Sequence, residues 1–167
     1  MKHAHSARAR GRAIGVAAAA ALAVAILGGL ATEIGPWYRA LHKPAFQPPD
    51  WAFGPAWTVI YALTALAGVL AWHAMPPLRA WARILALFAI NGVLNVLWSV
   101  LFFSLHRPDW ALAEVVPFWL SILALIVAIA PYARRAAWLL APYLLWVAFA
   151  GVLNYAVVRL NAPFGGV

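Results

Sequence analysis

The sequence predicts an all-α membrane protein, a bundle of five transmembrane helices with a long structured first loop capping one end. The first observation behind this is composition. Hydrophobic residues make up 66% of the 167 residues and charged residues only 10%, with a mean hydropathy of +0.87. Soluble domains carry roughly 25% charged residues. A soluble fold of this size cannot hide so much apolar surface, so lipid must be the solvent.

The second observation is a set of long uncharged windows. Each window is 19 residues or longer and ends at a charged residue, and a helix needs roughly 20 residues to cross a bilayer core. They do not alternate as the strands of a membrane barrel do. We expect one transmembrane domain over residues 13–161, between a basic, disordered tail at 1–12 and a short C-terminal tail at 162–167. The windows are 13–32, 51–78, 84–106, 115–133 and 136–158.

The first window follows a basic segment and therefore also resembles a secretory signal peptide, with a cleavage site near Gly28 to Ala31. Its apolar run is longer than the roughly 7–15 residues of a signal peptide. A retained first helix is the favoured interpretation.

Prolines and charges set the bounds of the other helices. The second is expected to begin near Pro55, a good first-turn residue. In the fourth, Asp109 is a plausible N-cap and Glu114 lies at the polar end. The fifth contains Pro142, which frees a carbonyl one turn back. The expected bounds are Pro55 to Met75, Trp81 to Leu105, Pro108 onward, and Arg135 to Arg159.

The segment 37–61 is the third observation. Its prolines stiffen it and exclude a regular helix through its middle, and its many aromatic rings favour a membrane–water boundary or a packed lid. We interpret it as a rigid cap over one mouth of the bundle. The alternative is an interfacial aromatic belt that binds no ligand. The prolines are Pro44, Pro48, Pro49 and Pro55, and the aromatics include Trp37, Tyr38, Phe46, Trp51, Phe53 and Trp57.

The distribution of Lys and Arg predicts the topology. Eight of these residues fall in the N-terminal tail and in the second–third and fourth–fifth connections, against four on the opposite side. The positive-inside rule therefore places the N-terminus in the cytoplasm and the cap and C-terminus outside. Because the basic residues sit at the ends of apolar runs rather than in one patch, the net charge of +8 does not indicate nucleic-acid binding.

Three helices carry stripes of polar, aromatic and small residues at helical spacing, which places each stripe on one helix face. Lipid cannot hydrogen-bond an amide, so the asparagines should face protein, water or a ligand. Intramembrane Asn often only holds helices together, and both roles stay open. Together the stripes predict an aromatic-walled cavity suited to a flat apolar ligand such as a porphyrin or a sterol. The stripes are Trp57, Tyr61, Thr64 and Gly68; Asn91, Asn95, Trp98 and Phe102; and Tyr143, Trp146, Ala150 and Asn154.

Other chemistry is disfavoured. The chain has no cysteine, which excludes disulfides, thiolate metal sites and cysteine nucleophiles. No charged residue lies in the central turns of a predicted helix, which disfavours a proton relay or ion-coupled transport. The histidines form no metal set, and no Ser/His/Asp arrangement or phosphate loop is present. We therefore expect no metal, no required cofactor and no dedicated catalytic residue.

Three motifs resemble the translocator protein / tryptophan-rich sensory protein family, formerly called peripheral-type benzodiazepine receptors. They are WYxxLxKPxxxPPxWxFxPAWTxxYxL over 37–63, NxxxNxxWxxxFF over 91–103 and PYLxWxxFAxxLNxxxxxLN over 142–161. The similarity extends from about Ile14 to Asn161. The chain departs from the family at Phe46 and Val158, where many members carry tryptophan, and Phe46 puts the ligand preference of the lid in question.

The resemblance implies a five-helix, commonly dimeric protein with a pocket under the first loop for porphyrins such as protoporphyrin IX or haem, for cholesterol and for synthetic ligands. It implies transport, sequestration or stress regulation, or alternatively light- and oxygen-dependent porphyrin breakdown with Trp57 and Trp146 as candidates. A loose sterol motif corresponds to Leu153, Tyr155 and Arg159. Small residues on the third helix, Ala82, Ala86, Ala89 and Gly92, can permit close helix approach. The expected ligand-binding residues are Tyr38, Pro48, Trp57, Tyr61, Asn91, Asn95, Trp98, Trp146 and Ala150.

Overall fold

A computed structural model describes residues 2–74 and 77–164, with the side chains of 2–10, 12 and 13 left out. The described residues form helices and no strand. The elements are α1 (Lys2–Ala31), α2 (Pro36–Ala40), α3 (Asp50–His73), α4 (Leu78–Ser99), the π-helix η1 (Val100–Ser104), α5 (Pro108–Ile129), α6 (Arg134–Leu139) and α7 (Ala141–Asn161). Within these ranges, five helical segments are long and apolar enough to cross a membrane, which confirms the predicted fold class.

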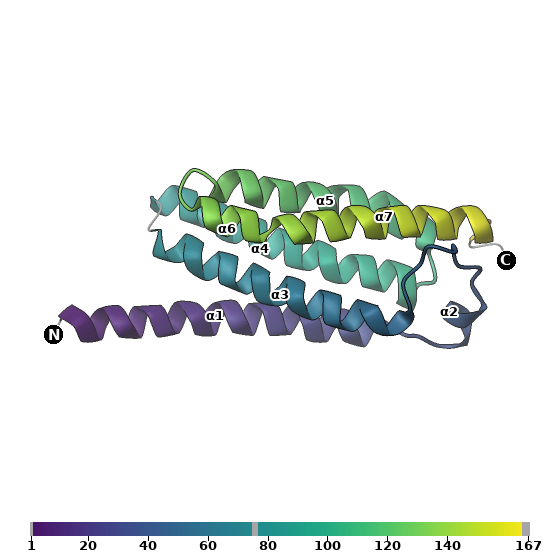
Figure 1. Ribbon diagram of the computed structural model, residues 1–167, viewed down its shortest axis with the longest axis horizontal. Helices are drawn as coiled ribbons and strands as arrows, with labels where there is room; N and C mark the ends of the chain where they lie inside the picture. Colours follow the sequence, from purple (N-terminus) through teal and green to yellow (C-terminus); the bar gives the residue numbers. More distant parts are fainter. Residues whose placement is uncertain (1, 75–76, 165–167) are drawn as a thin grey trace.

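The long helices run side by side along one axis (Figure 1). α1 packs on α3 and α4, α5 packs on α4 and α7, and α6 packs on α3. The loop containing α2 lies at the same end as the C-terminal end of α7, and the N-terminus lies at the opposite end. The first loop and the C-terminal end of α7 at one end, with the N-terminus at the other, agree with the predicted order of the spans. Which side of the membrane each end faces remains a prediction.

Most of the buried bundle core is apolar. Near the α6 end it consists of Ala67, Ala71, Ile84 and Leu125 with their neighbours, and small alanines there let α3 and α6 approach closely. α1 contributes little to this core, because only 6% of its spanning window is buried. It nevertheless packs along α3 and α4.

Two helix starts differ from the prediction. α1 begins at Lys2, so the tail expected to be disordered belongs to the first helix. Its alanines and arginines are good helix formers, and no proline interrupts them. α3 begins at Asp50, with Pro55 inside the helix rather than at its start. Pro55 lies in the second turn of α3, where its missing N–H removes only one backbone hydrogen bond close to the start of the helix. Met75, where this helix was expected to end, lies outside the described residues.

The third and fifth spans are interrupted where the sequence predicts continuous helices. The last turn of the third span widens into η1, where the Leu105 N–H donates to the Val100 carbonyl at 2.9 Å. In the fifth span, α6 ends before Leu140 and α7 starts at Ala141. Pro142 lacks the N–H that would continue the ladder, and the break falls at Leu140, two residues before it.

The start of the fourth span also differs. Asp109 is not the N-cap: the helix begins at Pro108, and Asp109 instead forms an ion pair with Arg107. Glu114 is buried, at 8% exposure, rather than at a polar helix end, and neither of its carboxyl oxygens has a hydrogen-bond partner among the described residues.

Candidate functional site

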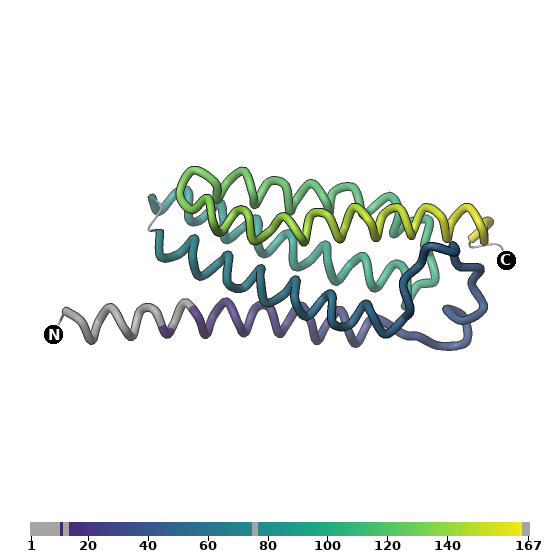
Figure 2. Tube along the Cα trace, viewed as in Figure 1, coloured from purple at the N-terminus to yellow at the C-terminus, as the bar shows by residue number. Residues whose placement is uncertain are grey.

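A cavity of about 540 Å³ lies beneath the first loop, between α1, α3, the α4–η1 segment and α7. This volume is within the range of about 300–1,000 Å³ typical of small-molecule sites. The loop passes over the end of the bundle and beside the C-terminal end of α7 before it enters α3 (Figure 2). The predicted cap therefore forms the roof of a cavity.

Aromatic rings form the walls of this cavity. Trp57 and Trp146 meet edge to face, with ring centroids 6.4 Å apart, and Trp57 stacks on Tyr61 at 5.4 Å. From the α4–η1 segment, Trp98 stacks on Phe102 at 5.2 Å. Such a set of faces and edges suits a flat apolar ligand, because aromatic contacts gain stability beyond the area that they bury.

A chain of hydrogen bonds crosses the bundle below the cavity, which we call the polar layer (Tyr61, Asn91, Asn95, Ser121 and Tyr143). The Tyr61 hydroxyl donates to Asn95 Oδ1 at 2.9 Å, and Asn95 Nδ2 donates to the Tyr143 hydroxyl at 3.0 Å. Tyr143 donates to Asn91 Oδ1 at 3.2 Å, and Asn91 Nδ2 donates to Ser121 at 2.9 Å. Because both asparagines are bonded to protein, each also has the role of holding helices together.

The structure brings most of the predicted ligand-binding residues together at this cavity. Asn95 lines it from the polar layer, at 4% exposure. Asn91 instead lines a second, mostly apolar cavity of about 470 Å³ between α1, α3 and α4. Pro48 and Phe46 are in the loop but not in the lining, and Phe46 is exposed. The predicted residues that line the cavity are Tyr38, Trp57, Tyr61, Asn95, Trp98, Trp146 and Ala150.

The residues of the sterol motif do not share a helix face. Leu153 is buried and lines the cavity. Tyr155 is 53% exposed, and Arg159 is exposed as well. Residues two and six positions beyond Leu153 point away from it on an α-helix. The motif therefore does not form one contiguous binding surface.

The roof carries a cluster of polar side chains that sequence reasoning missed. The Tyr38 hydroxyl donates to Asp50 Oδ1 at 2.9 Å, and Gln47 Nε2 donates to both Tyr38 and Asp50. Lys43 Nζ lies 3.4 Å from Asp50 Oδ2 and 3.8 Å from the centre of the Tyr38 ring. Burial, together with Asp50, raises the pKa of Tyr38 to about 12, so its hydroxyl stays neutral and donates at physiological pH.

Contacts with two other segments at this end of the bundle hold the roof in place. Asn161 at the end of α7 accepts from the His42 N–H and donates to the His42 carbonyl, both at 2.8 Å. On the other side, Trp37 stacks on His106 at 4.2 Å. His106 has a φ of 54°, an uncommon conformation for a residue other than glycine. The connection between η1 and α5 is thus shaped to meet the roof.

We expect Asn161→Ala to loosen the roof. The substitution removes both contacts to His42 and leaves the loop backbone without these partners, which corresponds to about 1–2 kcal/mol in total. Limited proteolysis within residues 41–49 should accelerate, while helix content measured by circular dichroism stays unchanged. Asn161→Asp is the matched variant, since it keeps the acceptor for the His42 N–H and loses only the donor. Equal cleavage rates in wild type and Asn161→Ala would contradict this role of Asn161.

Two further residues near the site make contacts that helical spacing does not predict. Gly28 of α1 lies against the polar layer, where a Cβ would be 3.8 Å from both Asn95 Oδ1 and the Tyr61 hydroxyl. When its side-chain amide oxygen and nitrogen are assigned from their neighbours, Asn154 donates to the Pro108 carbonyl and accepts from the Leu112 N–H, each at 3.0 Å. Its spacing predicts an inward position but not this helix contact. Within the described residues, no group of three His, Asp or Glu is placed to hold a metal ion.

These features define a class: an integral membrane, receptor-like helix bundle with an aromatic cavity beneath a structured loop. Residues 16–160 match the TspO/MBR family. The chain is 39% identical over 134 residues to the tryptophan-rich protein TspO of Archaeoglobus fulgidus, which covers 79% of this chain and 84% of that protein. It is 34% identical over 131 residues to the human translocator protein, covering 78% of each. The chain belongs to the TspO/MBR family, as the sequence motifs indicated.

Proposed function

We propose that this protein binds a porphyrin or a related flat tetrapyrrole in the cavity beneath the loop. Through that binding it acts in tetrapyrrole transport, sequestration or stress regulation. The observation that carries the proposal is the cavity of about 540 Å³ lined by Trp57, Trp98 and Trp146 from three different helices. Membership in a family with members named tryptophan-rich sensory protein and translocator protein supports a receptor or transport role.

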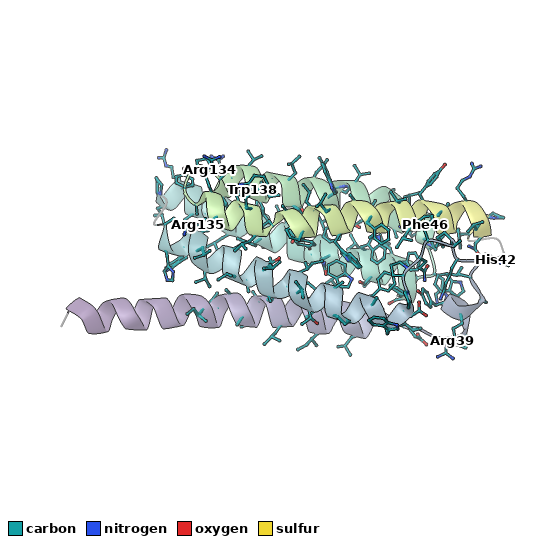
Figure 3. All side chains as sticks on the ribbon, in the orientation of Figure 1. Arg39, His42, Phe46, Arg134, Arg135 and Trp138 are labelled. Carbon is teal, nitrogen blue, oxygen red and sulfur yellow. The ribbon has the colours of Figure 1, made fainter. Side chains whose placement is uncertain are left out.

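We expect Trp57→Phe to weaken protoporphyrin IX binding by about three- to tenfold, because an aromatic contact of roughly 1 kcal/mol is reduced. Asn95→Ala should also weaken binding, since Tyr61 and Tyr143 lose their shared partner. Binding is measured by quenching of porphyrin fluorescence in a non-ionic detergent. Trp138→Phe is the matched control, because Trp138 is 71% exposed and lies at the opposite end of the bundle (Figure 3).

Folded variants at Trp57 and Asn95 that bind like wild type would show that the cavity is not the porphyrin site. Weaker binding in Trp138→Phe as well would indicate a nonspecific effect of removing tryptophan.

A second candidate function is light-dependent porphyrin breakdown with dioxygen as the oxidant. The observation that favours it is the pairing of Trp57 and Trp146, which both line the cavity and meet with ring centroids 6.4 Å apart. An excited porphyrin held there can take an electron from an indole and pass it on to dioxygen, and the reduced oxygen species formed beside the ring can then oxidise it. Illumination in air should then bleach protoporphyrin IX, and darkness, or Phe at both positions, should stop the bleaching. Saturable quenching without bleaching supports simple binding.

The proposal includes a homodimer, with an interface that uses three of the four small residues named from the sequence of α4. Ala82, Ala86 and Ala89 form an exposed stripe on α4, which can permit close helix approach. Gly92 is not part of that surface, because a Cβ there would be 3.1 Å from Val24 of α1. We propose the first three positions as the dimer contact.

A further inference from the structure

The charged residues of the cavity are confined to its roof. Among the described lining residues, Lys43 and Asp50 are the only ones with charged side chains, and they pair at 3.4 Å. The floor and the walls have only hydroxyl, amide, indole and apolar groups. A ligand in this cavity therefore meets a positive charge at one place, beneath the loop.

Lys43 can leave Asp50 without isolating either group. Asp50 keeps the hydrogen bonds from Tyr38 and Gln47, and it lies in the first turn of α3, where the helix dipole favours a negative charge. Lys43 keeps its contact with the Tyr38 ring at 3.8 Å. Their side chains are 25% and 41% exposed, and exposed pairs of this kind contribute little to stability. An incoming carboxylate can therefore compete with Asp50 for Lys43.

We propose that Lys43 is the specificity residue of this site and that it selects planar aromatic ligands with a peripheral carboxylate. The ring lies between the tryptophan-lined walls, and its carboxylate replaces Asp50 as the partner of Lys43. Asp50 acts as the internal competitor that occupies Lys43 when the site is empty. This inference rests on the proposed porphyrin site, and it names the ligand chemistry that the site prefers.

The test compares protoporphyrin IX, which carries two propionates, with its dimethyl ester, which has the same ring and no negative charge. Affinity for both is measured in one non-ionic detergent by fluorescence quenching, and the acid-to-ester affinity ratio is compared between variants. Partition of the ester into micelles cancels in that comparison. Lys43→Met should lower the ratio by about fivefold, through weaker binding of the acid alone.

Asp50→Asn should raise the ratio, since it removes the competitor and keeps a polar side chain for Tyr38. Lys43→Arg should restore most of the preference, which separates the charge from a merely structural role of the side chain. Arg39→Gln is the charge-matched control. Arg39 belongs to the same loop, is exposed and points away from the bundle (Figure 3), so its loss should leave the ratio unchanged.

An acid-to-ester ratio that is the same in wild type and in folded Lys43→Met would overturn the inference while leaving porphyrin binding intact. An equal fall in Arg39→Gln would also overturn it, because the effect would then come from the overall charge of the loop. If neither porphyrin binds wild type saturably, the proposed function itself fails, and the inference fails with it.

Discussion

Filling the cavity from α7 should abolish porphyrin binding. Ala150 lines the cavity one helical turn beyond Trp146, and a tryptophan there would occupy the space that the ligand needs. We expect Ala150→Trp to weaken protoporphyrin IX binding by at least about tenfold. The new ring enters an open hollow rather than a packed core, so overpacking is limited and the protein should stay folded.

The matched control is Ala148→Trp, because Ala148 lies on the same helix and is exposed. It adds the same side chain to the outer surface and should leave affinity unchanged. Unfolding in a dodecyl sulfate titration checks that both variants are folded. Wild-type affinity in folded Ala150→Trp would mean that the ligand binds elsewhere.

Removing one hydroxyl from the polar layer should lower the stability of the bundle. Tyr143 is 3% exposed, and its hydroxyl accepts from Asn95 and donates to Asn91. In Tyr143→Phe, Asn95 Nδ2 and Asn91 Oδ1 lose this partner inside the membrane. We expect the free energy of unfolding to fall by about 1–2 kcal/mol, the sum of two buried hydrogen bonds in such surroundings.

Tyr155→Phe is the internal control, since it makes the same change on the same helix at a residue that is 53% exposed. Its unfolding midpoint should match that of wild type. If both variants unfold at the wild-type midpoint, the polar layer does not stabilise the bundle. If both are destabilised equally, the effect belongs to tyrosine on α7 in general.

The five spans could be predicted from the sequence, because lipid demands long uncharged windows and charges mark their ends. Helical spacing also identified the inward faces that carry Trp57, Asn95 and Trp146. Spacing does not give depth along the bundle. Asn91 and Asn95 are one turn apart on the same face, yet they line different cavities. Tyr143 of α7 forms hydrogen bonds with both asparagines.

The loop was the least predictable part of the site. Loop residues follow no period, so nothing in the sequence indicated that Lys43 and Asp50 would meet over Tyr38. Proline content predicted a stiff cap but not the start of α3 at Asp50, which depends on Pro49 as the residue before the helix. Nor does a short motif show that Tyr155 and Arg159 face away from Leu153; helix geometry decides that.

The most direct test of the central claim is a crystal structure of the protein bound to protoporphyrin IX. We predict ligand density between Trp57, Trp98 and Trp146 under the loop, with the polar layer intact below it. Density in the apolar cavity between α1, α3 and α4, or on the lipid-facing surface of the bundle, would contradict the assignment of the site.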